Sequence, residues 1–285
     1  MTKADELTPV AYAAAGFEIA LFVGGIGLIL WLLFSGRGRE KMAVRLTEWH
    51  LPLVDFACYA FFAILGFLVL GAVVGLVLRH VNLDDDSRQV LGGAVQDIGL
   101  LLGMAVFHFF YRGHLPAGNE GLRPLALRAL RSGAVTFLAV MPLVVISEVI
   151  WDYVLTRLGL PMENQDLMDV LQNTHSVWLM TSLMVIATLV APLAEELIFR
   201  GGLFRYLRTR APRWAAILGT SVLFGALHVH WGGKFEGLPS LAPLTVLAAV
   251  FCVAYERTGL IATTIVAHAL FNLNTFVQVA AGFGS

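Results

Sequence analysis

Long, predominantly apolar stretches recur along this chain, and they restrict its fold more than any other feature. A helix needs about 20 predominantly apolar residues to cross a hydrocarbon core of roughly 30 Å. Stretches that reach or approach this length lie at approximately 9–34, 51–78, 90–111, 132–156, 177–204, 213–230, 240–256 and 259–283. Because only helices and closed barrels satisfy their backbone in lipid, we predict an all-α, polytopic bundle of about eight transmembrane spans.

The composition agrees with a membrane protein and leaves no room for a separate soluble domain. The chain of 285 residues is 58% hydrophobic and only 14% charged, whereas about a quarter of a soluble domain is charged. We predict one membrane domain in two parts, with spans one to four and their loops in 1–176 and spans five to eight in 177–285. The net charge of −1 says nothing about a nucleic-acid partner, and no basic stripe with interleaved aromatics indicates one, so we expect membrane lipids and no nucleic acid as partners.

Lysine and arginine collect after every second span, which indicates the orientation of the chain. They follow the first, third and fifth spans, as Arg37, Arg39, Lys41 and Arg45, then Arg112, Arg123, Arg128 and Arg131, then Arg205, Arg208, Arg210 and Arg213. Cytoplasmic loops carry such an excess of basic residues. We therefore expect an integral multi-pass protein of a bacterial plasma (inner) membrane, with a retained first span and both termini outside the cytoplasm.

Polar side chains inside the apolar spans mark the candidate functional residues, because such groups are costly in lipid. They form three clusters, namely Glu195, Glu196 and Arg200, then Phe224 and His228, then His268 and Asn272. Counting inward from the basic loops at 1.5 Å per residue places Glu195, His228 and His268 roughly 14–22 Å deep. Similar depths on three helices predict one shared site.

The two adjacent glutamates are expected to do different work. Residues four apart share a helix face, so Glu196 and Arg200 can form an ion pair. Glu195 lies about 100° around the helix and points elsewhere. An unpaired carboxyl group among apolar helices is suited to exchange a proton with water. The spacing thus predicts Glu195 for proton transfer and Glu196 for support of the fold.

The other two clusters add histidines and a second polar partner. His268 and Asn272 are four apart, so their side chains can donate hydrogen bonds toward one point. Two convergent donors can stabilise a developing oxyanion. Phe224 precedes His228 by one helical turn and can wall its imidazole ring from lipid.

In order and spacing, these residues resemble the three motifs of the CAAX-protease and bacteriocin-processing family of intramembrane endopeptidases. The motifs are Glu195-Glu196-xxx-Arg200, Phe224-xxx-His228 and His268-xxx-Asn272. The resemblance covers about 190–275 and implies that 177–285 holds the catalytic core. It implies that Glu195 and His228 activate water for peptide hydrolysis. It likewise implies an oxyanion pair in His268 and Asn272, and support from Glu196 and Arg200.

The resemblance also implies the partners of such a protein. The expected substrates are membrane-associated or lipidated, CAAX-like peptides, with no cofactor. Zinc is an alternative, because Glu195, His228 and His268 form a His₂Glu set that can bind this metal. We favour metal-independent chemistry, since Asn272 is a poor zinc ligand and a good oxyanion donor.

Other classes of protein remain as alternatives to this interpretation. The chain contains no HExxH motif of zinc proteases, and Ser221 lacks the following glycine of a rhomboid-type serine site. A non-catalytic immunity or scaffold protein could use the same polar residues structurally, and a transporter could use Glu195 and Arg200 as a gate. The polar motifs all lie in the second half of the chain, whereas transporters often repeat them in both halves. This asymmetry favours an enzyme.

Overall fold

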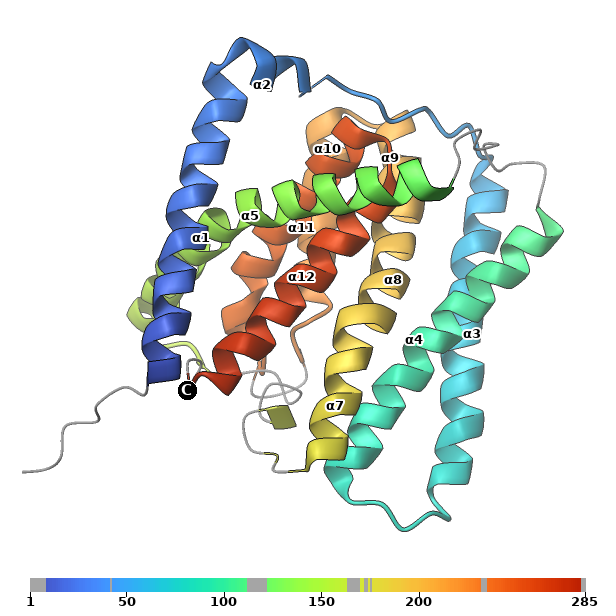
Figure 1. Cartoon of the computed structure of the whole chain (residues 1–285). Coiled ribbons are helices and arrows are strands. Elements are labelled where there is room, and N and C mark those ends of the chain that lie inside the picture. Colours follow the sequence, from blue (N-terminus) through green and yellow to red (C-terminus); the bar gives the residue numbers. More distant parts are fainter. Residues whose placement is uncertain are drawn as a thin grey trace, which may run out of the picture.

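The computed structural model describes residues 9–41, 43–111, 122–162, 170–171, 174, 176–231 and 235–282, so the predicted basic residue Arg112 lies outside the described residues. This part of the chain contains helices and no strand, which confirms the all-α class (Figure 1). The helices outside the fifth span are α1 (Pro9–Phe34), α2 (Gly36–Lys41), α3 (Leu53–Leu78), α4 (Asp85–Phe110), α5 (Leu122–Leu158), α10 (Arg213–Ala226), the 3₁₀ turn η4 (Leu238–Ser240), α11 (Leu241–Thr258) and α12 (Ile261–Ala280).

The chain is an integral membrane protein by the length and composition of these helices. In the described part, six stretches are long and apolar enough to cross a membrane, and they lie in α1, α3, α4, α5, the fifth span and the η4–α11 stretch. The other two predicted spans correspond to α10, which is short at 14 residues, and to α12, which is 20 residues long and carries several polar side chains. Helices therefore lie at all eight predicted positions. Two of them, α10 and α12, do not qualify as membrane spans by length and hydropathy alone.

Several predicted boundaries differ from the structure, those of the fourth and sixth spans among them. The fourth span was expected over 132–156, but α5 begins ten residues earlier, so Arg128 and Arg131 belong to a helix rather than to a loop. The sixth span was expected to reach residue 230, but α10 ends at Ala226. The indole nitrogen of Trp231 donates to the Ala226 carbonyl at 2.8 Å, which caps the helix end with a side chain instead of another turn.

The fifth span is a continuous but irregular helix. It consists of α7 (Val177–Val185), the π-helical segment η2 (Ile186–Val190), α8 (Ala191–Glu196), the π-helical segment η3 (Leu197–Phe204) and α9 (Arg205–Arg210). Pro192 lies at the start of α8; it has no N–H to donate, and its ring crowds the carbonyl four residues earlier, so a wider turn precedes it. Both glutamates of the first motif thus lie on one short α-helical piece between two π-helical ones, a feature frequent at functional sites.

The neighbours of the fifth span satisfy its altered backbone. The Tyr59 hydroxyl on α3 donates to the Leu197 carbonyl at 2.9 Å, at the start of η3. Gly202 lies directly against the same tyrosine ring, because a Cβ atom there would lie 2.5 Å from Tyr59 Cε1. The helix that carries the glutamates is therefore fixed against α3 as well as α4.

Close packing of small residues joins α3 to α4. A Cβ atom on Gly99 would collide with the backbone at Gly66, and one on Gly103 would collide with the backbone at Phe62. Such small residues let two helix backbones approach closely in a membrane. The α3–α4 pair stands beside the fifth span in Figure 1, and α4 provides contacts with α7, η2 and α8.

Helix α5 crosses the bundle obliquely and holds the other half together. It packs against α1, α11 and α12 (Figure 1). The principal buried cluster lies where α5, η3, α10, α11 and α12 meet, and its members include Val140, Phe199, Phe224, Leu247 and Phe251. This core surrounds the residues of the three motifs.

Residues 43–52, named the strap here, run from α2 toward α3 across one end of the bundle. The Arg205 guanidinium of α9 donates to the Thr47 hydroxyl at 3.0 Å, and Arg210 donates to a strap carbonyl at 3.2 Å. Two strap amides donate to the Glu256 carbonyl at the end of α11, both at 3.0 Å. The basic residues after the first and fifth spans therefore gather at the same end of the molecule.

The Glu256 side chain strengthens this end of the bundle. Its two oxygens accept hydrogen bonds from Arg208 Nε at 2.7 Å and from Arg213 Nε at 2.8 Å, while the glutamate side chain itself is fully buried. A carboxylate between two guanidinium groups remains satisfied despite burial. Sequence reasoning missed this residue, although a glutamate ending an apolar span is a detectable signal.

Candidate active site

The predicted ion pair of the first motif forms, and it is completely enclosed. Arg200 Nη1 donates to Glu196 Oε1 at 2.8 Å, and neither side chain is exposed. The guanidinium carbon lies 4.6 Å from the centroid of the Phe224 ring and 5.3 Å from that of Phe251. Cation–π contacts with these rings add to the ion pair.

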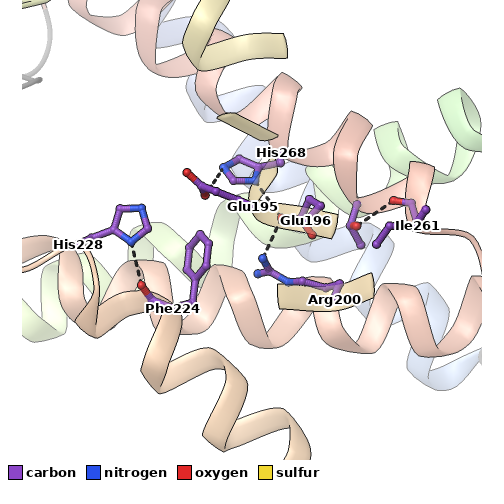
Figure 2. A network of polar contacts seen from close by, with 8 residues as sticks. Glu195, Glu196, Arg200, Phe224, His228, Ile261 and His268 are labelled. Carbon is purple, nitrogen blue, oxygen red and sulfur yellow. Dashed lines mark hydrogen bonds and ion pairs between the residues drawn. The ribbon is translucent and has the colours of Figure 1, made fainter. Parts of the chain in front are cut away.

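Glu196 also binds a histidine, which the sequence did not predict. His268 Nδ1 lies 2.9 Å from Glu196 Oε1, the same oxygen that accepts from Arg200 (Figure 2). An ionised carboxylate only accepts hydrogen bonds, so we infer that Nδ1 carries a proton. In the neutral ring, Nε2 is then the acceptor nitrogen. Glu196 thus fixes the orientation and the tautomer of the His268 ring.

Glu195 occupies different surroundings from its neighbour. Its side chain is 22% exposed, whereas that of Glu196 is fully buried. Glu195 Oε2 lies 3.8 Å from His268 Nε2 and has no direct hydrogen-bond partner. A separation beyond 3.5 Å leaves room for a bridging water. The helical spacing correctly separated the two glutamates, and the structure turns Glu195 toward the acceptor nitrogen of His268.

His228 lies just beyond α10, beside the Phe224 ring (Figure 2). Its Nδ1 atom is 2.8 Å from the Phe224 carbonyl, which directs Nε2 away from the backbone. The fully buried Phe224 ring lies 4.7 Å from the His228 ring and 6.2 Å from the His268 ring, measured between centroids. Phe224 therefore lies near both histidine rings, rather than only shielding His228 from lipid.

Asn272 contacts the fifth span instead of converging directly on His268. Its Nδ2 atom donates to the Ala187 carbonyl of η2 at 2.7 Å. An amide nitrogen has two N–H groups, so one remains for another acceptor. The structure thus bonds Glu196 to His268, places Glu195 3.8 Å from the same ring, and connects Asn272 to the same span through the backbone.

The zinc alternative does not fit this arrangement. Within the described residues, which include all three candidate ligands, no three His, Cys, Asp or Glu side chains gather closely enough to hold a metal ion. Glu195 and His268 approach each other, whereas His228 stands apart from His268 beside the Phe224 ring (Figure 2).

Comparison with known proteins finds a family similar to part of the second half of the chain. Residues 176–274 match the family described as type II CAAX prenyl endopeptidase Rce1-like. This segment is similar to the Rce1-like family. The Rce1-like segment contains all seven motif residues and begins one residue before α7. It leaves 1–175 unassigned, so the division of the domain at residue 176 stays a prediction.

A bacterial relative covers a similar share of the chain. The protein named "Putative membrane peptidase YdiL", from Bacillus subtilis (strain 168), is 33% identical over 129 residues. That alignment covers 45% of this chain and 47% of the relative, so the match spans about half of each protein. No solved structure matches the chain.

Asp97 lies on α4, which packs against the α8 piece that carries Glu195. An aspartate inside an apolar span is visible in the sequence, but the sequence does not show which helices α4 contacts.

Proposed function

We propose that the chain is an intramembrane endopeptidase that hydrolyses peptide bonds in membrane-associated or lipidated, CAAX-like peptides. The observation that carries this proposal is the contrast between two adjacent glutamates. Glu196 is sealed in an ion pair with Arg200, whereas the partly exposed Glu195 faces a histidine nitrogen. The Rce1-like match and the relative named as a membrane peptidase support the same activity.

In this proposal Glu195 is the proton carrier. Its carboxylate takes a proton from a water molecule whose oxygen bonds to the scissile carbonyl carbon. When the C–N bond breaks, Glu195 returns that proton to the leaving amine nitrogen. His228 assists by accepting a hydrogen bond from the same water, because its Nδ1 is directed to the Phe224 carbonyl and its Nε2 is left free.

His268 and Asn272 then stabilise the oxyanion. The Nδ1 atom of His268 donates to Glu196, so Nε2 donates to an oxyanion only when the ring is the doubly protonated imidazolium. The buried Glu196 carboxylate stabilises that cation. Asn272 contributes the N–H that is not used by the η2 carbonyl. Glu196 is thus a positioning residue for His268 in addition to its support of Arg200.

The orientation of the chain determines how a peptide reaches this site. We propose that the end holding the strap and the arginines of α9 faces the cytoplasm of a bacterial cell, because basic residues collect on that side. Both chain termini then lie outside. A substrate enters sideways from lipid or from the cytoplasmic side, and a lipid anchor raises its concentration in the membrane.

Matched peptides test this proposal directly. The full chain is reconstituted in bilayers with two fluorogenic peptides of identical sequence, one of them lipidated, and is compared with the Glu195→Gln variant. Cleavage by the wild type that Glu195→Gln abolishes is expected, with a lower KM for the lipidated peptide because each buried CH₂ contributes about 0.8 kcal/mol. Equal cleavage of both peptides refutes the lipid-access proposal. No Glu195-dependent cleavage of a broad peptide library refutes the protease and favours a non-catalytic protein.

A further inference from the structure

Helices α3 and α4 meet closely along only part of their length. In the middle of the pair, their backbones touch at Gly66, Gly99 and Gly103. Toward the connection between the two helices they border a groove of about 200 Å³, whose lining includes Gly75 and Gly92. A Cβ atom on either of these two glycines would have no neighbouring heavy atom within 4 Å. The glycines of this stretch therefore border open space, whereas those of the middle lie at a helix contact.

The groove has apolar walls and a cationic mouth. Val74 and Val95 line it, and both belong to helices that are apolar enough to cross a membrane. Arg79 and Arg88 line it near the connection between the helices. Gln96 lines its deeper part, eight residues after Arg88, which corresponds to about 12 Å along α4. The groove thus runs from two guanidinium groups into the apolar part of the helix pair.

Arg88 is held in place at the mouth. Its Nη1 atom donates to the Leu78 carbonyl at 2.9 Å and its Nη2 atom donates to the Leu83 carbonyl at 3.1 Å, so it joins the last turn of α3 to the connection before α4. A guanidinium group has five N–H donors, and these two bonds leave others for a ligand. Arg79 is exposed directly after α3 and lines the same mouth. Two such groups attract a phosphate, which arginine can bind through two parallel hydrogen bonds.

The position and size of the groove agree with a lipid. Its mouth lies where α3 ends and α4 begins, at the end of the bundle away from α2 (Figure 1). Sites for compact small molecules have about 300–1,000 Å³, so a groove of about 200 Å³ accommodates part of a long molecule. The exposed residues Asp84, Asp85 and Asp86 precede Arg88, and their charges favour a headgroup that carries an ammonium group beside its phosphate.

We propose that this groove binds a membrane glycerophospholipid, with the phosphate against Arg79 and Arg88 and one acyl chain between α3 and α4. Basic pockets between transmembrane helices bind lipid headgroups in other membrane proteins. The lipid fills the space that the glycines leave and bridges the two helices where their backbones part. None of the residues that line the groove belongs to the three motifs, so this binding does not depend on the proposed peptidase activity.

Two glycine variants test the place of the acyl chain. Gly92→Leu puts a side chain into the groove, whereas Gly93→Leu makes the same change at the next residue, which is exposed and does not line it; a Cβ atom has no neighbour at either position. Each purified chain is stripped of lipid, supplied with phosphatidylethanolamine in detergent, and examined by native mass spectrometry and thermal unfolding. The wild type and Gly93→Leu should retain one lipid and unfold at a higher temperature with it, and Gly92→Leu should lose both effects. Equal retention by the two glycine variants overturns the proposal.

Arginine variants and a lipid without phosphate test the mouth of the groove. Arg79→Gln and Arg88→Gln should each weaken binding of phosphatidylethanolamine about tenfold, the effect of a lost hydrogen bond to a charged group. Arg39→Gln, at an exposed site of α2, should leave binding unchanged. Arg88→Gln also loses two internal hydrogen bonds, so Arg79→Gln decides the result if that variant fails to fold.

Diacylglycerol with the same acyl chains lacks the phosphate, and the wild type should not retain it. Retention of diacylglycerol equal to that of phosphatidylethanolamine overturns the proposal, as does phosphatidylethanolamine binding that neither arginine variant weakens.

Discussion

Replacing Glu196 by glutamine tests the role of the buried ion pair most directly. The carboxylate is fully buried and accepts from Arg200 at 2.8 Å and from His268 at 2.9 Å through one oxygen. Glutamine fills the same volume but is neutral, so Arg200 becomes a buried cation without a counter-charge. Breaking a buried pair in this way costs about 3–5 kcal/mol. In a protein of this size, the loss corresponds to a melting temperature lower by roughly 10 °C.

Glu195→Gln is the matched control for this experiment, because it makes the same chemical change one residue away. Glu195 is partly exposed and has no partner within hydrogen-bond distance in the structure, so its loss should leave stability nearly unchanged while stopping hydrolysis. Thermal unfolding of both variants is measured in the same detergent. A larger loss of stability for Glu195→Gln than for Glu196→Gln would show that the two roles are exchanged.

Three further changes test other parts of the structure. Gly202→Ala should lower stability by about 1–3 kcal/mol through overpacking, since its Cβ would lie 2.5 Å from the Tyr59 ring, whereas Gly201→Ala, with no neighbour nearer than 3.8 Å, should be neutral or stabilising in thermal unfolding. Glu256→Gln should release its two arginines at a cost of about 1–3 kcal/mol and speed protease cleavage within the strap; an unchanged cleavage rate would contradict the stabilising role of Glu256 at this end of the bundle. Purified protein is expected to contain no stoichiometric metal by elemental analysis and to keep its activity after exhaustive chelation, and a bound zinc whose removal stops turnover would refute the metal-independent mechanism.

Hydrophobic length and helical spacing predicted much of this structure. The eight apolar stretches correspond to eight helices, and the spacing of four residues correctly predicted the pair of Glu196 with Arg200. Both signals depend only on neighbours along one helix, which a sequence displays directly. The same spacing did not reveal that Glu196 also receives His268, because that contact joins residues 72 positions apart.

The irregular parts of the helices were beyond sequence reasoning for a related reason. Pro192 marks a disturbance in the fifth span, but a proline is compatible with a kink, a break or a wider turn. The choice of π-helical turns depends on partners such as Tyr59, which arrive from another helix. The end of α10 before His228 similarly depends on a side-chain cap that has no strong signature.

The strap sets an order for the assembly of this protein during its synthesis. Thr47 leaves the ribosome early, yet its partner Arg205 follows 158 residues later. Until α9 has been inserted, residues 43–52 have nothing to bind at the end of the bundle, and the first two spans are joined by a loose connection. Contacts between such distant residues form late in folding. A chain stopped before α9 should therefore hold α1 and α3 in the membrane without fixing their separation, and membrane quality control would encounter that open intermediate first.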